Sequence, residues 1–177
     1  TIAELMSDAG YSTAAYGKWH IGDTDGRLPH DQGFDEWYGI KESAMAASFS
    51  STSQFDPEVF DLQYIWEGKK GEKAIKSKEF NLDTRANLDL ELVDKASRFI
   101  KSNAANNRPF YLYLALTQIH PPFRPQEGFE GKSGAGEYAD IQMQVDFNVG
   151  NILDAIKESG IEENTIVILT NDNAAAE

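Results

Sequence analysis

Apolar residues recur at helical spacing in two long segments of the chain. The first begins at a possible N-cap, Asp83-Thr84, and runs to about residue 105. Its apolar face consists of Leu88, Leu92, Ala96, Phe99 and Ile100. The second runs from about residue 136 to residue 159 and ends before Gly160. Its inner side is predicted to carry Ile141, Val145, Val149, Ile152, Leu153 and Ile156. A shorter helix is predicted over residues 1–7, with Thr1 as N-cap and Gly10 after its end.

Three other segments have the composition of β-strands. Residues 11–16 form a short β-prone run, whereas residues 110–116 and 165–170 are nearly continuous apolar runs typical of strands buried on both faces. Residues 64–71 indicate a hairpin edge, and the lysine-rich stretch 69–78 is predicted to be solvated. The aromatic stretch 32–39 is predicted to be an ordered loop. Strands that alternate with long helices predict an α/β fold, with a mostly parallel sheet and helices on both faces.

Polar side chains follow each of the three predicted strands. Lys18 and His20 follow the first strand after Gly17, which we expect to permit an abrupt turn, and His120 follows the second. Asp172 and Asn173 follow the third strand. Because ligands of such sheets bind outside the carboxyl ends of the strands, we expect all five side chains at one edge of the sheet.

These residues divide into two chemical groups. Asp172 and Asn173 offer oxygen ligands, which suit a hard cation such as Ca²⁺ or Mg²⁺, although two ligands need further carboxylates to complete a site. Lys18, His20 and His120 are donors that suit a sulfate or phosphate group. Each residue alone also has an ordinary explanation, as a turn, a cap or a loop residue, so the prediction rests on their coincidence.

Composition narrows the class of protein. The 177 residues are 41% hydrophobic, enough for one core, and the net charge of −13 argues against a general nucleic-acid surface. No apolar run approaches the ~18 residues of a membrane span, and no signal peptide is visible. Cysteine is absent, which removes disulfides and thiolate sites. Because the chain opens on a helix without Met, we expect an internal piece of a longer protein.

The motifs around these residues resemble the sulfatase family of the alkaline-phosphatase-like superfamily, over nearly the whole chain. The string Gly10-Tyr11-x-Thr13-x-x-x-Gly17-Lys18-Trp19-His20-x-Gly22 resembles a family signature and is highly specific. Further similar landmarks are Gln32-Gly33-Phe34-Asp35, Pro109-Phe110-x-Leu112, Gly131-Lys132-Ser133-Gly134, Tyr138-Ala139-Asp140 and the strand that ends in Asp172-Asn173.

The resemblance implies a metal-dependent hydrolysis of sulfate esters. Lys18 would contact the sulfate group, His20 would hydrogen-bond the nucleophile, and His120 would face the sulfate and assist the leaving group. Asp172 and Asn173 would bind a divalent cation, usually calcium. Arg124, four residues after His120, could bind an anionic substrate, and a surface role is an equal alternative. The substrate would be a sulfated small molecule or a sulfated glycan, and the 41–80 region, a probable insertion, would influence its choice.

The chain also departs from the family pattern. The family's formylglycine nucleophile is made from a Cys/Ser-x-Pro-x-Arg motif, which residues 1–177 do not contain. We therefore expect a central part of the catalytic domain, inactive alone and without the nucleophile segment or the C-terminal domain. The Asp172-Asn173 pair is followed by Ala174 where the family usually has Gly. Two alternatives stay open: a phosphate- or phosphonate-ester hydrolase of the same superfamily, and a non-catalytic module that binds sulfated ligands. By family habit, a periplasmic or extracellular location is favoured.

Overall fold

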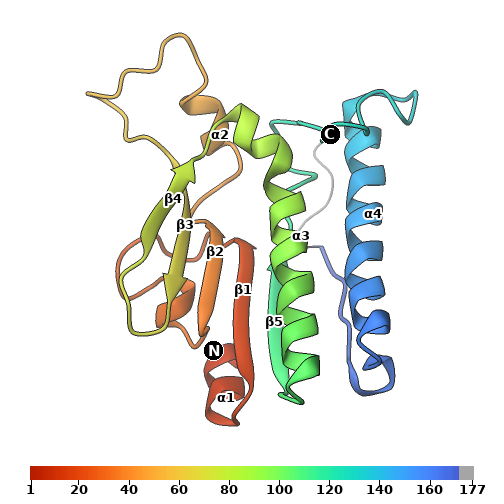
Figure 1. Cartoon of the computed structure of the whole chain (residues 1–177). Coiled ribbons are helices and arrows are strands. Elements are labelled where there is room, and N and C mark those ends of the chain that lie inside the picture. Colours follow the sequence, from red (N-terminus) through yellow and green to blue (C-terminus); the bar gives the residue numbers. More distant parts are fainter. Residues whose placement is uncertain (172–177) are drawn as a thin grey trace.

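The computed structural model describes residues 1–171, and its centre is a five-stranded mixed sheet (Figure 1). The strands are β1 (Ser12–Lys18), β2 (Glu36–Ile40), β3 (Tyr64–Lys69), β4 (Ile75–Glu79) and β5 (Phe110–Ala115), in the order β4-β3-β2-β1-β5. β1 is parallel to both of its neighbours, β2 and β5, whereas β3 and β4 form an antiparallel hairpin on the outer side of β2. The predicted α/β class and hairpin edge are confirmed, and the parallel part consists of β2, β1 and β5.

Helices cover the two faces of the sheet unequally. The helical elements are α1 (Ile2–Asp8), η1 (Pro29–Asp31), α2 (Ala46–Phe49), α3 (Leu82–Ala105), α4 (Glu137–Glu158) and η2 (Glu162–Asn164). The long α3 lies across one face with α4 beside it, while the short α1 and η1 pack against the other face (Figure 1). Because side chains alternate along a strand, Ala14 of β1 joins the core under α3, and Ala15 joins the core with Ala3 of α1.

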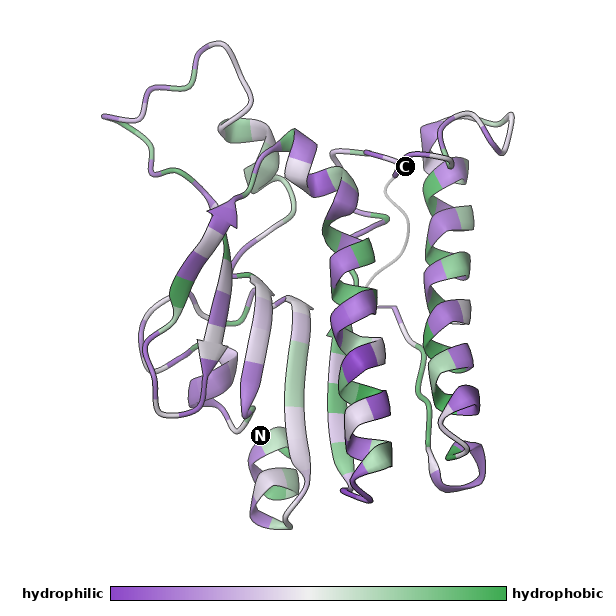
Figure 2. Cartoon of the chain, in the orientation of Figure 1, coloured by the Kyte–Doolittle hydropathy of each residue, from purple (hydrophilic) through white to green (hydrophobic). Residues whose placement is uncertain are grey.

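The helical periodicity of α3 is confirmed in detail. Leu88, Leu92, Ala96 and Ile100 are fully buried, and hydrophobic and hydrophilic residues alternate along the helix as expected for one buried face (Figure 2). The N-cap is Asn81, two residues before the predicted Asp83-Thr84. The backbone of Asn81 is extended, and its side chain accepts hydrogen bonds from the backbone N–H groups of Asp83 and Thr84 at 3.1 and 3.0 Å.

In α4 the predicted inner face is partly wrong. Ile141 and Ile156 are buried as expected, but Leu153 is 46% exposed. Gln144 and Asn148 occupy the buried stripe instead. At Gln144 the cause is local, because its side-chain oxygen accepts a hydrogen bond of 2.8 Å from the backbone N–H of Gln126, in the loop that faces α4.

Three strand predictions require correction. The run 165–170 is not a strand of this sheet: Ile166 and Ile168 are 90% and 83% exposed, and no backbone ladder joins the run to β5 in the described residues. For the same reason β5 is an edge strand with half-buried residues, and Tyr113 is 40% exposed. Conversely, the predicted loop 32–39 contains most of β2, which is buried because it lies between β1 and β3. An apolar run becomes a buried strand only where a neighbour pairs with it.

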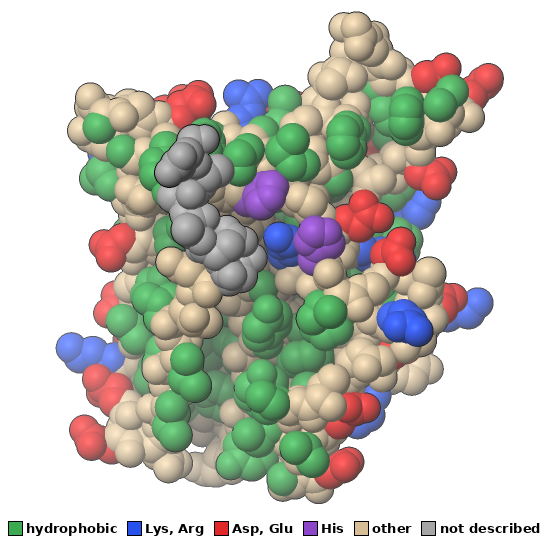
Figure 3. All heavy atoms as spheres, turned by 180° about the vertical axis from the view of Figure 1, so that it is seen from behind, with side chains coloured by type: hydrophobic (Ala, Val, Ile, Leu, Met, Phe, Trp, Pro, Cys, Tyr) green, Lys and Arg blue, Asp and Glu red, His purple; other side chains and the backbone are tan. Residues whose placement is uncertain are grey.

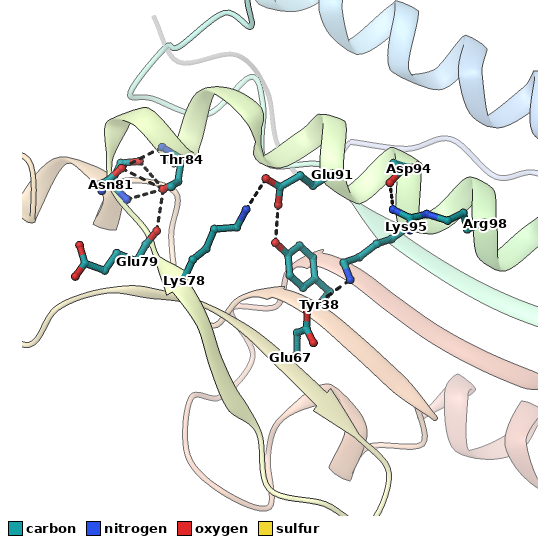
Figure 4. A network of polar contacts seen from close by, with 10 residues as sticks. All are labelled: Tyr38, Glu67, Lys78, Glu79, Asn81, Thr84, Glu91, Asp94, Lys95 and Arg98. Atoms are coloured by element: carbon teal, nitrogen blue, oxygen red, sulfur yellow. Dashed lines mark hydrogen bonds and ion pairs between the residues drawn. The ribbon is translucent and has the colours of Figure 1, made fainter.

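A polar network ties α3 to the hairpin (Figure 4). Glu91 of α3 accepts hydrogen bonds from Lys78 Nζ of β4 at 2.6 Å and from the Tyr38 hydroxyl of β2 at 2.5 Å. Lys95 Nζ of α3 lies 3.5 Å from Glu67 Oε1 of β3. The run 69–78, predicted to be solvated, comprises the end of β3, the hairpin turn and the first part of β4, and its residues are mostly exposed. No helix of the described part is both long enough and apolar enough to cross a membrane.

Candidate active site

The parallel strands approach each other unusually closely at their carboxyl ends, and two glycines permit this. A Cβ on Gly17 would lie 1.8 Å from the carbonyl oxygen of Ala115, and a Cβ on Gly39 would lie 1.9 Å from the oxygen of Gly17. Gly17 also has a φ of +116°. The predicted role of Gly17 in an abrupt turn is wrong: this residue lies inside β1 and is needed for close backbone contact with β5.

Lys18 and His20 lie at the carboxyl end of β1. Lys18 is the last residue of the strand and is half-buried, whereas His20 is exposed. The ladder to β2 continues past the strand, because Trp19 N–H donates to Ile40 O at 3.0 Å and His20 N–H donates to Lys41 O at 2.9 Å. The backbone therefore fixes the place of His20 relative to the segment that follows β2.

His120 lies beyond the carboxyl end of β5, at the same edge of the sheet as Lys18. Its Nδ1 is 2.6 Å from the carbonyl oxygen of Pro121. Since a carbonyl oxygen can only accept, this contact places a proton on Nδ1 and leaves Nε2 for other partners. Nε2 lies 3.5 Å from the hydroxyl of Ser43.

The segment 41–43 connects the two histidines. Lys41 accepts the backbone hydrogen bond of His20, and Ser43, two residues on, lies beside His120. In the described residues, β1 and β5 are parallel neighbours, so Lys18, His20 and His120 follow strands that end at the same edge of the sheet. On the face opposite α3, histidine side chains and a basic side chain gather above a broad apolar area (Figure 3).

A buried clamp from α3 holds the loop that carries His120. Arg85 is fully buried. Its guanidinium group donates to the backbone carbonyl oxygens of Thr117 and His120 at 2.7 and 3.0 Å, to Gln118 Oε1 at 3.2 Å, and to the Thr117 hydroxyl. Asp89, also fully buried, accepts from the backbone N–H groups of Thr117 and Gln118 at 2.8 and 2.9 Å and from the Thr117 hydroxyl at 2.6 Å. Thr117 thus links the guanidinium to the carboxylate.

The electrostatics of this clamp follow from its burial. Burial lowers the pKa of Arg85 below its ordinary value, and the nearby Asp89 carboxylate counteracts part of that shift. Sequence reasoning missed both residues. The available signal was an Arg and an Asp four residues apart on the same helical face as Leu88 and Leu92.

The backbone is strained on both sides of the site. His20 has a φ of 55° and Ile119 a φ of 45°, which is rare for a non-glycine residue and especially for a β-branched one. Such conformations persist only where surrounding contacts impose them, and they cluster at functional sites. The Arg85 contacts on either side of Ile119, to Gln118 and His120, supply that restraint.

The remaining predicted site residues have different outcomes. Arg124 is exposed on the loop after His120, and its carbonyl oxygen accepts from Gln118 Nε2 at 3.0 Å, so the clamp reaches its backbone. Asp172 and Asn173 lie outside the described residues. Among residues 1–171, no group of three or more His, Cys, Asp or Glu side chains is arranged to hold a metal ion.

Comparisons with known proteins assign the family. The sulfatase family model matches residues 1–176. The chain is 35% identical over 176 residues to the N-acetylgalactosamine-6-sulfatase of the dog, covering 99% of this chain and 33% of that protein. The crystal structure of the PsFucS1 sulfatase from Pseudoalteromonas sp. superimposes with a TM-score of 0.81 at 27% identity, over 92% of this chain and 35% of that one.

A second solved structure shares the fold. The complex of Ps i-CgsB with k-i-k-neocarrahexaose superimposes with a TM-score of 0.70 at 24% identity, over 92% of this chain and 37% of that one. The chain spans about a third of the length of these proteins. Because the family model matches residues 1–176, the chain belongs to the sulfatase family.

Proposed function

We propose that the full-length protein containing this chain hydrolyses sulfate esters carried by sugars. The observation that carries the proposal is the meeting of Lys18, His20 and His120 at one sheet edge, linked through the segment 41–43. Hydrolysis of sulfate esters is the activity of the family. Because the dog relative is an N-acetylgalactosamine-6-sulfatase, we propose a 6-sulfated N-acetylgalactosamine unit of a glycan as the first substrate to test.

Lys18 and His120 have complementary roles in this proposal. Lys18 ends β1 as a half-buried ammonium group, suited to binding the sulfate oxygens and offsetting their charge. The Nδ1–H group of His120 donates a hydrogen bond to the Pro121 carbonyl oxygen, so Nε2 is the ring nitrogen left to act on the substrate. When Nε2 is protonated, it can donate that proton to the oxygen of the departing alcohol.

His20 and the metal complete the proposal. His20 would hydrogen-bond a formylglycine nucleophile supplied from outside this chain, which contains no Cys and no Cys/Ser-x-Pro-x-Arg motif. Asp172 and Asn173 would help hold Ca²⁺, or Mg²⁺, because carboxylate and amide oxygens suit a hard cation. When bound, the cation would offset charge on the sulfate oxygens. Residues 1–177 alone would then be inactive.

Steady-state hydrolysis by the full-length protein tests the assignment. We expect turnover of 6-sulfated N-acetylgalactosamine and of an aryl sulfate, with much slower turnover of the matching aryl phosphate. His120→Ala should lower kcat on the sugar ester by about 10²–10⁴-fold, as expected for loss of a general acid. Lys18→Met should also reduce kcat/KM. Lys101→Met, which changes an exposed lysine paired with Glu158, is the matched control and should retain wild-type turnover.

Three results would contradict the proposal. Faster hydrolysis of the aryl phosphate would favour the phosphate-ester alternative. Binding of sulfated sugars without any turnover would favour a non-catalytic module. Near wild-type turnover by both His120→Ala and Lys18→Met would show that the two residues do not act on the substrate.

A further inference from the structure

A cavity of about 490 Å³ lies beside the candidate active site, at the carboxyl end of β2. Ser43 belongs both to its lining and to the contact with His120, so the cavity and the candidate site share a wall. Its volume falls in the range of roughly 300–1,000 Å³ that is typical of small-ligand sites.

One wall of this cavity combines aromatic rings with ammonium groups. Tyr64 and Trp66 are two residues apart on β3, so their side chains lie on the same face of the sheet, and the rings are 6.2 Å apart. Lys41 Nζ lies 3.7 Å from the centre of the Trp66 ring. Lys76 Nζ lies 4.0 Å from the centre of the Tyr64 ring and 5.9 Å from that of Trp66.

The two ammonium groups contact aromatic rings and a backbone carbonyl oxygen. In the part of the chain that the structure describes, neither Lys41 nor Lys76 forms an ion pair, and Lys41 Nζ donates instead to the carbonyl oxygen of Asp23 at 3.0 Å. Lys41 Nζ and Lys76 Nζ both lie within about 6 Å of the centre of the Trp66 ring, whose negative faces attract ammonium groups. An anionic group of a ligand in the cavity could pair with either ammonium group.

The remainder of the lining suits hydroxyl groups. Asp23, Glu42 and Asp61 contribute carboxylates, which accept hydrogen bonds, and Gln63 contributes an amide that both donates and accepts. Aromatic faces for C–H groups, acceptors for hydroxyl groups and two cations for an anion match the chemistry of an acidic sugar. A purely apolar ligand would leave these polar groups without partners.

We propose that this cavity is a second sugar subsite, which binds an anionic saccharide unit next to the sulfated unit at Lys18, His20 and His120. Lys41 and Lys76 would pair with the carboxylate or sulfate of that neighbouring unit, and Tyr64 and Trp66 would pack against its ring. This inference rests on the proposed function, which identifies the sulfated unit at Lys18, His20 and His120. It assigns the substrate preference to the sugar bound in the cavity.

The experiment compares three substrates with the full-length protein. They are 6-sulfated N-acetylgalactosamine, the disaccharide in which this unit is linked to a uronic acid, and the disaccharide with a neutral hexose in place of the uronic acid. We expect wild-type kcat/KM to be at least about 10-fold higher for the acidic than for the neutral disaccharide, as expected for charge-assisted hydrogen bonds. The Lys41→Gln/Lys76→Gln double variant should lose this preference.

The matched control is Lys132→Gln, because Lys132 also lies over an aromatic ring, 4.6 Å from the centre of Phe129, but outside the cavity lining. This variant should keep the wild-type preference. An equal preference in the double variant and the wild type, or no preference in the wild type, would overturn the subsite. A loss of thermal stability in the double variant with an unchanged preference would show that the lysines serve only the hairpin.

Calorimetric binding of the acidic disaccharide without its sulfate separates the two proposals. If no sulfate ester is hydrolysed but the wild type binds this disaccharide and the double variant does not, the proposed function fails and the subsite stands. If sulfate esters are hydrolysed but both proteins bind this disaccharide equally or not at all, the subsite fails and the function stands.

Discussion

The two sides of the candidate site differ in how their side chains are held. On the β5 side, the loop that carries His120 is fixed by the fully buried Arg85 and Asp89, through hydrogen bonds to backbone and side-chain oxygens and amides. On the β3–β4 side, Lys41 and Lys76 are half-buried or exposed and contact mainly aromatic rings. Substitutions on the first side should therefore disturb the fold and the catalytic geometry together, whereas substitutions on the second should change recognition alone.

The largest effect is expected for Arg85→Met, which removes the guanidinium and leaves the oxygens of Thr117, Gln118 and His120 without their buried donor. Breaking a buried charged network of this kind costs about 3–5 kcal/mol. Denaturant unfolding of the full-length protein measures this change. Because the same substitution releases the His120 loop, kcat on the sugar sulfate should also fall in the fraction that remains folded.

The matched control for the clamp is Arg98→Met, which makes the same change on the same helix. Arg98 pairs with Asp94 on the surface, where the two side chains are 71% and 56% exposed, so its loss should cost less than about 1 kcal/mol. Equal losses for the two variants would refute the contrast between a buried clamp and a solvated surface pair.

The Arg85–Asp89 clamp also shows a limit of prediction from sequence. Periodicity identified α3 because Leu88, Leu92 and Ala96 repeat at helical spacing, but the same pattern treats Arg85 as a solvated residue. Its burial depends on the oxygens of a loop more than thirty residues away. Local sequence does not contain that partner.

Strand pairing is a second feature that the sequence predicts only in part. The ends of β1 and β5 could be placed together because parallel strands bring their carboxyl ends to one edge, and Lys18 and His120 follow from that rule. The run 165–170 has an equally apolar pattern, yet no strand pairs with it in residues 1–171, and Ile166 is almost fully exposed. Composition predicts the tendency to form a strand, and the neighbouring strand decides whether it forms.

Gly17→Ala tests the junction between the two sides, where β1 passes between β2 and β5. The new Cβ would meet the Ala115 carbonyl at 1.8 Å and would also impose an unfavourable positive φ. Overpacking and backbone strain together should cost about 3 kcal/mol of unfolding free energy. Gly26→Ala is the control, because Gly26 also has a positive φ but no atom lies within 4 Å of the added Cβ.

Gly26→Ala should therefore cost only about 1–2 kcal/mol, the price of the left-handed conformation alone. Thermal or denaturant unfolding of both variants measures the difference. If Gly17→Ala were no more destabilising than Gly26→Ala, the close approach of β1 and β5 would not be a constraint on the site.

The smallest effect is expected at Tyr38, which links the hairpin side to α3 through its hydrogen bond to Glu91. Tyr38→Phe should cost about 1 kcal/mol near neutral pH. Burial, and then the Glu91 carboxylate, raise the pKa of Tyr38 well above its ordinary value near 10. A raised folded-state pKa means that the native state holds its proton more tightly, so this stability is complete below about pH 10 and is lost as the pH rises further.

Unfolding free energies of the wild type and Tyr38→Phe, measured from pH 7 to pH 11, separate this contribution from simple packing. The difference in unfolding free energy between the wild type and Tyr38→Phe should shrink above about pH 10. The tyrosine of the unfolded chain ionises there, whereas the folded one remains protonated beside Glu91. Tyr16 behaves in the same direction because burial and Glu36 raise its pKa, but it is present in both proteins and cancels in the difference. A difference that stays constant over the whole range would mean that Tyr38 stabilises the contact between β2 and α3 by packing, and that the two sides of the site are joined without its hydroxyl group.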